Sequence, residues 1–117
     1  MEEEGDWAEY RRAMMEGRYF EAHEILEVPW RRSRDHRLQI AIWIAAAFVH
    51  WTREQPIGAI RLFTRILNDP EAEDLPIRHT IERWIRAVDA GENPRASRTP
   101  DLEPLRRWVS RDPNAAY

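Results

Sequence analysis

Apolar residues recur along this chain at the three-to-four-residue spacing of amphipathic helices, and no segment alternates with the period of two that is typical of strands. The strongest signal covers about residues 35–53, a stretch that is apolar on nearly every side of a helix. Such a helix has to be covered by other elements over most of its surface. We therefore predict an all-α fold, a compact up-and-down bundle of five to six helices around this central apolar helix, with no sheet.

Two helices are predicted before the central one. The first begins at Asp6, whose carboxylate can cap the first turn, and ends at Gly17, because glycine adopts the left-handed conformation without steric cost. The second covers about residues 19–28, since Pro29 removes a backbone donor and should end or kink it. The apolar faces of the two helices comprise Trp7, Tyr10 and Met14, then Tyr19, Ala22, Leu26 and Trp30.

Three shorter helices are predicted after the central one. Proline is tolerated in a first helical turn, and Gly or Pro residues often stand just beyond a last one. The boundaries are marked by Gln55-Pro56, Asn68-Asp69-Pro70, an acidic loop at 71–74, Gly91, a linker at 92–98 and Thr99-Pro100. The apolar stripes are Ile60, Phe63 and Leu67, then Ile77, Ile81, Trp84, Ile85 and Val88, and finally Leu102, Leu105, Trp108 and Val109.

Length and composition limit the class of protein. With 117 residues the chain has the size of one domain, so we expect a single helical domain over 1–117, with the C-terminal helices in 69–117. The absence of cysteine excludes disulfides and thiolate chemistry. The acidic start lacks the basic and apolar regions of a signal peptide, and the central apolar run is too short to span a membrane. We expect a soluble, cytoplasmic protein.

The distribution of charge argues against a polyanionic partner. The 18 basic residues, all of them arginine, are scattered among 21 acidic ones and leave a formal charge of -3. This pattern provides no one-sided basic surface for phosphates. The six Trp residues are best explained as large apolar side chains that pack in the core or in an interface. We expect no nucleic-acid partner and no membrane partner, and we keep a homodimer or a protein partner as open alternatives.

The polar residues that stand out lie on the second and central helices. His23 and Glu27 are one turn apart at the border of the apolar stripe, while Glu24 lies further toward solvent. On the central helix Gln39 and His50 share one face three turns apart, which is roughly 16 Å along the axis. One small ligand or metal could not easily touch both.

Three interpretations of this cluster remain open. In the first, His23 and His50 hydrogen-bond across the helix interface and fix the packing. This interpretation is favoured because polar groups inside helical bundles are more often hydrogen-bonded core residues than site residues. In the second, His23 and Glu27 join one further His or carboxylate to bind a divalent metal. That spacing is weak evidence, because the zinc-protease motif His-Glu-x-x-His needs a histidine where this chain has Glu27. In the third, Glu24 or Glu27 is a general base partnered by a histidine.

Two blocks of the chain resemble a known family. The first is Gly17–Glu27, which reads Gly-Arg-Tyr-Phe-Glu-Ala-His-Glu-Ile-Leu-Glu, followed by Trp30-Arg31. The second is Leu38–His50, where Leu-Gln-Ile-Ala-Ile-Trp precedes an alanine-rich stretch and a histidine, with Gly58-Ala59 opening the next helix. Over about residues 6–68 these blocks resemble the domain-of-unknown-function family 309. The resemblance implies a compact helical bundle and no established activity.

The chain also departs from the pattern of that family. Trp43 stands where the family has a second Gln, Ile40 stands where it has Gly, and Pro29 interrupts the Glu-rich approach to Trp30. If the polar residues of the family line one pocket, an indole and a branched side chain fill part of it here. The candidate binding residues are Tyr19, Trp30, Gln39 and Trp43.

We therefore interpret the chain as a small helical-bundle protein with a structural or protein-interaction role, whose polar cluster mainly specifies packing. The alternative is a hydrolase-like metal-dependent or acid-base enzyme that uses His23, Glu24, Glu27 and His50. In that alternative His23 and Glu27 are the candidate ligands of a divalent metal. The two interpretations differ in whether these side chains are paired in the packing or converge on an open polar cavity.

Overall fold

The computed structural model describes residues 2–94 and 102–110, and for residues 2–4 it describes the backbone alone. Within this part the chain is helical and forms no strand. The elements are α1 (Glu2–Met15), α2 (Tyr19–Ser33), α3 (His36–Thr52), α4 (Pro56–Leu67), the 3-10 turn η1 (Pro70–Ala72), α5 (Arg78–Asp89) and α6 (Glu103–Val109). The prediction of an all-α bundle of five to six helices is confirmed.

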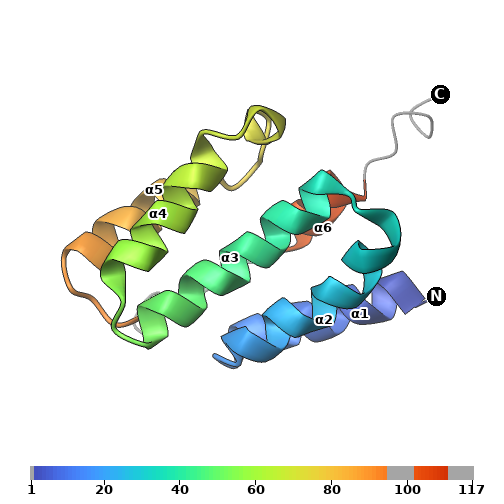
Figure 1. The fold of residues 1–117 in the computed structure, drawn as a ribbon, viewed down its shortest axis with the longest axis horizontal. Coiled ribbons are helices and arrows are strands. Elements are labelled where there is room, and N and C mark those ends of the chain that lie inside the picture. Colours follow the sequence, from blue (N-terminus) through green and yellow to red (C-terminus); the bar gives the residue numbers. More distant parts are fainter. Residues whose placement is uncertain (1, 95–101, 111–117) are drawn as a thin grey trace.

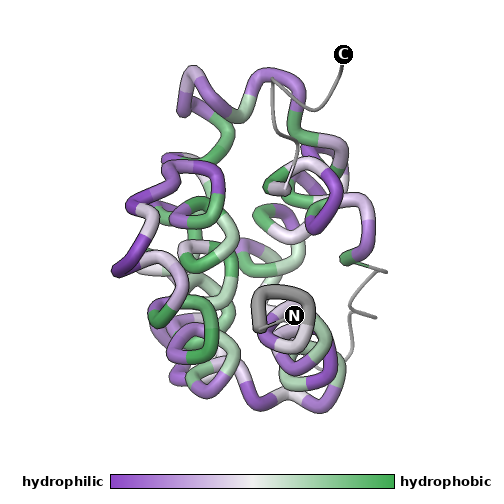
Figure 2. Tube along the Cα trace, turned by 90° about the vertical axis from the view of Figure 1, so that its right-hand side faces the viewer, coloured by the Kyte–Doolittle hydropathy of each residue, from purple (hydrophilic) through white to green (hydrophobic). Residues whose placement is uncertain are grey.

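The central position of α3 is also confirmed. It runs between α2 and α4, while α1 packs on α2, α5 packs on α4, and α6 lies against α3 (Figure 1). Hydrophilic segments lie mainly on the outside of the bundle and hydrophobic ones face its interior (Figure 2). Asp35 caps α3, because its carboxylate accepts a hydrogen bond of 2.9 Å from the backbone N–H of Arg37.

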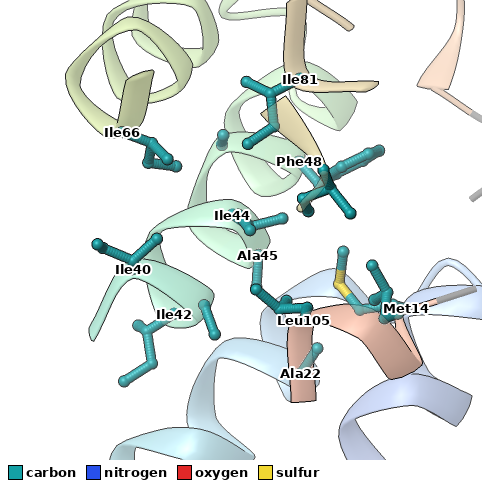
Figure 3. Packing of buried hydrophobic residues seen from close by; sticks show 14 of the residues in the cluster. Met14, Ala22, Ile40, Ile42, Ile44, Ala45, Phe48, Ile66, Ile81 and Leu105 are labelled. Atoms are coloured by element: carbon teal, nitrogen blue, oxygen red, sulfur yellow. The ribbon is translucent and has the colours of Figure 1, made fainter. Parts of the chain in front are cut away.

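Phe48 of α3 lies where four helices meet. Its ring centroid is 4.9 Å from Tyr19 of α2, 5.8 Å from Phe63 of α4 and 4.9 Å from Trp84 of α5. Tilted and edge-on aromatic pairs of this kind contribute about 0.5–1.5 kcal/mol each beyond their burial. Aliphatic side chains from α3, Ile66 of α4 and Leu105 of α6 complete the core around it (Figure 3).

Two predicted helix boundaries are wrong. Helix α1 begins at Glu2, four residues before Asp6, because glutamate is a good helix former and negative charge is favourable in a first turn. Helix α2 continues through Pro29 to Ser33. Proline in a helix interior costs about 3 kcal/mol, and the added turn offsets this by packing Trp30 against the core. Arg34, with a left-handed φ of 55°, then ends the helix.

The remaining boundaries follow the sequence closely. Gly17 and Gly91 have φ values of 79° and 77°, as expected of glycines that end helices. The segment 71–74 is not a simple loop, since η1 forms there with Asp69 as its cap. The predicted cap at Thr99-Pro100 and most of the 92–98 linker lie outside the described residues. None of the described helices is long and apolar enough to cross a membrane.

Arg37 anchors α6 to the start of α3. Its guanidinium donates to the backbone oxygen of Trp108 at 2.9 Å and lies 4.6 Å from the centre of the Trp108 indole. It also pairs with Glu71 at 3.2 Å, and Trp108 donates from Nε1 to Asp74 at 2.9 Å. A helix of seven residues is too short to be stable alone in water. Its order therefore depends on this anchor and on burial of its apolar side.

His36 and Asp69 join the start of α3 to the segment after α4. The Nε2 atom of His36 donates to a carboxylate oxygen of Asp69 at 2.6 Å, and the backbone N–H of Glu71 donates to the other at 2.9 Å. Partial burial acts to raise the pKa of Asp69, but these hydrogen bonds and the charges of His36 and Arg65 outweigh it and lower that pKa.

This pairing predicts a loss of stability in acid. A carboxyl with a lower pKa in the folded than in the unfolded state stabilises the fold at high pH and loses that contribution as the pH falls through its folded pKa. Asp69→Asn keeps a capping side chain but removes the charge. At pH 7 we expect a loss of about 1 kcal/mol, since His36 is partly exposed and solvent weakens the pair.

Urea denaturation across pH checks this expectation. The difference between Asp69→Asn and the unchanged protein should be present at neutral pH, shrink as the pH falls below the ordinary carboxyl value of 3.8, and disappear below the lower folded pKa. The control is Glu73→Gln, an exposed carboxylate of the same segment. A difference for Asp69→Asn that persists unchanged in strong acid would contradict the role assigned to the charge.

Candidate functional site

His23, Glu27 and Arg31 form a stack along one side of α2. His23 Nε2 lies 3.3 Å from Glu27 Oε1, and an Arg31 nitrogen lies 3.0 Å from Glu27 Oε2. The three residues are four apart, so the 3.6-residue period places them on successive turns of one face. The ring of Phe20 stacks on His23 at 6.2 Å with an interplanar angle of 13°. Glu24 is exposed, as the sequence indicates.

The two ring nitrogens of His23 differ in their surroundings. Nε2 faces the carboxylate of Glu27, to which a protonated Nε2 can donate. The Nδ1 atom is buried and has no hydrogen-bond partner among the described residues. A general base or a metal ligand must present its lone pair to a reactant or an ion. Nδ1 of His23 is therefore closed to a reactant or an ion, and only Nε2, beside Glu27, is accessible.

His50 packs against α4 rather than α2. Its Nδ1 atom lies 2.8 Å from the side-chain oxygen of Gln55. The ring also lies over Gly58, where an added Cβ would be 2.8 Å from Nδ1 and 3.0 Å from the ring carbon Cγ. Real Cβ atoms essentially never approach so closely, so the glycine is what allows His50 this position.

Trp43 likewise belongs to the contact between α3 and α4. The guanidinium of Arg65 lies 4.4 Å from the centre of its ring, and His36 meets it edge-on at 5.7 Å. The polar line of α3 therefore faces α4 through Trp43 and His50. The His23–Glu27 pair lies on α2 and contacts Phe20 and Arg31 of the same helix, so the two groups of candidates have different partners.

The other candidates are placed individually. Tyr19 is buried against Phe48 in the core. Trp30 is partly buried, with the guanidinium of Arg34 at 4.4 Å from its ring centre. Gln39 is partly buried on α3, one turn from Trp43. Tyr19 is thus a packing residue, and the Trp30 and Trp43 rings are each covered by an arginine.

The donor set for a metal is small. Among the residues that the structure describes, no group of three or more His, Cys, Asp or Glu side chains is arranged to hold a metal ion. His23 and Glu27 supply two adjacent groups, whereas protein zinc sites use three or four protein ligands. Nothing in the described part adds the third ligand that the metal hypothesis requires.

Sequence reasoning missed Phe20, an exposed aromatic residue at the start of α2. Phe20 is 52% exposed and lies off the buried stripe of α2. The guanidinium of Arg53 is 5.8 Å from its ring centre. A shallow hollow of about 270 Å³ lies beside it, lined by Gly17, Arg18, Tyr19, Phe20, Glu21, Val49, Thr52 and Arg53. The available signal was an aromatic residue on the polar side of an amphipathic helix.

The fold and the site define a small all-helical bundle protein whose polar candidates mostly lie in contacts within or between helices. Residues 7–62 match the model of the family described as Domain of unknown function (DUF309). The match confirms the family predicted from the sequence and ends within α4. The comparisons with curated proteins and with solved structures gave no match.

Because His50 lies so close to Gly58, we predict that Gly58→Ala changes the free energy of unfolding in opposite directions with and without the His50 ring. Gly58→Ala should destabilise the unchanged protein by about 1 kcal/mol, because overpacking costs about 1–3 kcal/mol and the gain in helix propensity is at most about 1 kcal/mol. In a His50→Ala background the ring is gone, so the same substitution should stabilise. Urea denaturation of the four proteins measures both effects and their coupling. Stabilisation by Gly58→Ala in both backgrounds would contradict the predicted clash.

Proposed function

We propose that this protein has a structural or protein-interaction role and that its polar cluster serves to specify helix packing. The observation that carries the proposal is the state of His23, whose accessible nitrogen is paired with Glu27 and whose other nitrogen is buried. His50 supports it independently, because its ring fills the space over Gly58. Because His50 packs across the contact between α3 and α4, it can fix the register of these two helices.

An interaction role is supported by where apolar side chains remain exposed. The large exposed ones among the described residues are Met15, Phe20, Val28 and Ile57. Three of them lie on or next to the α1–α2 and α3–α4 connections, which Figure 1 shows at the same end of the bundle. We call the residues 15–20 and 52–57 the turn end. A contiguous exposed apolar patch is typical of protein-binding surfaces, and these three side chains are the candidates for one.

The packing role of His23 is tested by His23→Ala. The substitution removes a partly buried ring together with its contacts to Glu27 and Phe20. We expect a loss of about 1 kcal/mol in the free energy of unfolding, which corresponds to roughly 4 °C in Tm for a domain of this size. The matched control is Glu24→Ala, an exposed residue of the same helix, which should stay within about 0.5 kcal/mol.

Elemental analysis of the purified protein separates this proposal from the enzyme alternative. On the packing role, the metal content of the unchanged protein and of His23→Ala should be the same. Full thermal stability of His23→Ala, combined with loss of a stoichiometric metal, would overturn the proposal. That result would instead favour the metal-dependent enzyme, with His23 and Glu27 as ligands.

A further inference from the structure

We propose that His36 and Arg65 form a site for acyl transfer from small esters that carry a carboxylate. The site lies where the start of α3 meets the end of α4. It uses neither His23 nor His50 and is independent of the packing role proposed above. The observation that carries it is the hydrogen bond of 2.6 Å between His36 and Asp69, beside an arginine that is open to an anion.

Asp69 is held as an ionised acceptor. Its side chain is 11% exposed, and one of its oxygens accepts from the backbone N–H of Glu71 at 2.9 Å. Partial burial acts to raise its pKa, but the hydrogen bonds and nearby cations outweigh this and lower the pKa. An ionised carboxylate has no proton to donate. The contact of 2.6 Å therefore requires the proton on Nε2 of His36.

The other ring nitrogen of His36 is free to react. The side chain is 42% exposed, and Nδ1 has no hydrogen-bond partner within the described part of the chain. With the proton on Nε2, the lone pair of the neutral ring is on Nδ1. A carboxylate orients the histidine of a Ser-His-Asp triad in the same way, through one nitrogen. His23 lacks this property, because its Nδ1 is buried.

Arg65 selects the class of ester. Its guanidinium lies 4.4 Å from the centre of the Trp43 ring, and His36 meets the same indole edge-on at 5.7 Å, so both groups border one side chain. Stacking on an aromatic face fixes the guanidinium plane and leaves its N–H edge available for bidentate binding of a carboxylate. Within the described residues no carboxylate lies at ion-pair distance from Arg65. Its charge acts on Asp69, but that group is already bonded to His36 and Glu71.

The surrounding charges leave an excess of positive charge. Glu71 and Asp74 pair with Arg37 at 3.2 and 3.7 Å, and Asp35 caps the start of α3. Glu73 is the acidic residue of 69–74 that has no ion pair with any described residue. Helix α4 carries two arginines and no acidic residue. An anionic ester is therefore favoured over a neutral one at the end of α4.

The reaction balances with water as the second reactant. The lone pair of Nδ1 attacks the ester carbonyl carbon, and the bond from that carbon to the leaving oxygen breaks with its electron pair. The acylimidazolium keeps its proton on Nε2, where the negative charge of Asp69 stabilises it. Water then adds to the acyl carbon, and the bond from that carbon to Nδ1 returns its electrons to the ring. The water supplies the oxygen of the released acid and the proton taken up by the leaving oxygen.

Hydrolysis of acetoxynitrobenzoate, a nitrophenyl acetate that carries a carboxylate, tests the site with the full chain. We expect saturable release of the nitrophenolate, faster than from nitrophenyl acetate itself. His36→Gln should lower kcat at least about tenfold, because it removes the reacting nitrogen. The matched control is His79→Gln, since the His79 ring is 99% exposed and also lies near a carboxylate, at 3.5 Å from Glu82. That control should leave the rate unchanged.

Two further variants separate binding from positioning. Arg65→Gln should raise KM for acetoxynitrobenzoate about tenfold, because it removes charge-assisted hydrogen bonds to the carboxylate, and should leave hydrolysis of nitrophenyl acetate unchanged. Asp69→Asn should lower kcat with KM unchanged, because Asp69 orients the ring without touching the ester. Circular dichroism verifies that each variant is folded.

The site of acylation is located by peptide mapping after brief incubation with the ester. An acetyl group on His36, and not on His79, is the expected result. Hydrolysis that is insensitive to His36→Gln, or equally sensitive to His79→Gln, would overturn the proposal. So would an Arg65→Gln variant that treats the two esters as the unchanged protein does. None of these results bears on the stability of His23→Ala, so the packing role and the acyl-transfer site can fail independently.

Discussion

A helix that is apolar on nearly every side can persist in water only if other helices cover it, and α3 imposes this constraint on the whole chain. Nine of its residues are buried, and Phe48 contacts aromatic rings from three neighbouring helices. The amphipathic stripes of α2, α4, α5 and α6 are the complementary surfaces. Helices α2, α4 and α6 pack directly on this apolar cylinder, while α1 packs on α2 and α5 packs on α4, so the bundle is built outward from α3.

Much of the fold was predictable because helix periodicity and glycine chemistry are local. The α3 boundaries, the start of α4 at Pro56 and the glycine at position 91 follow from residues close in sequence. The extension of α2 past Pro29 was not predictable from local rules, because tertiary packing of Trp30 offsets the local cost of a proline inside a helix. The pairing of His36 with Asp69 spans 33 residues, and no local pattern encodes it.

In the candidate site, contacts within one helix were predictable and contacts between helices were not. The His23–Glu27 contact follows from a spacing of four residues on one helix. The placement of Trp43 and His50 did not follow, because a helical wheel gives the angle of a side chain on its own helix but not which neighbour lies at that angle. The opposing residues, Arg65 and Gly58, lie on α4 and carry no mark of this role in the sequence.

The anchor between Arg37 and Trp108 has a consequence for the order in which the protein can fold during synthesis. The contacts among α1, α2, α3 and α4 join neighbouring segments, which are made early and can form early. Arg37 must wait for a partner 71 residues later in the chain. Until α6 emerges, the apolar surface that it covers stays open on a partial bundle of the earlier helices, and this is the stage at which chaperones would meet the chain.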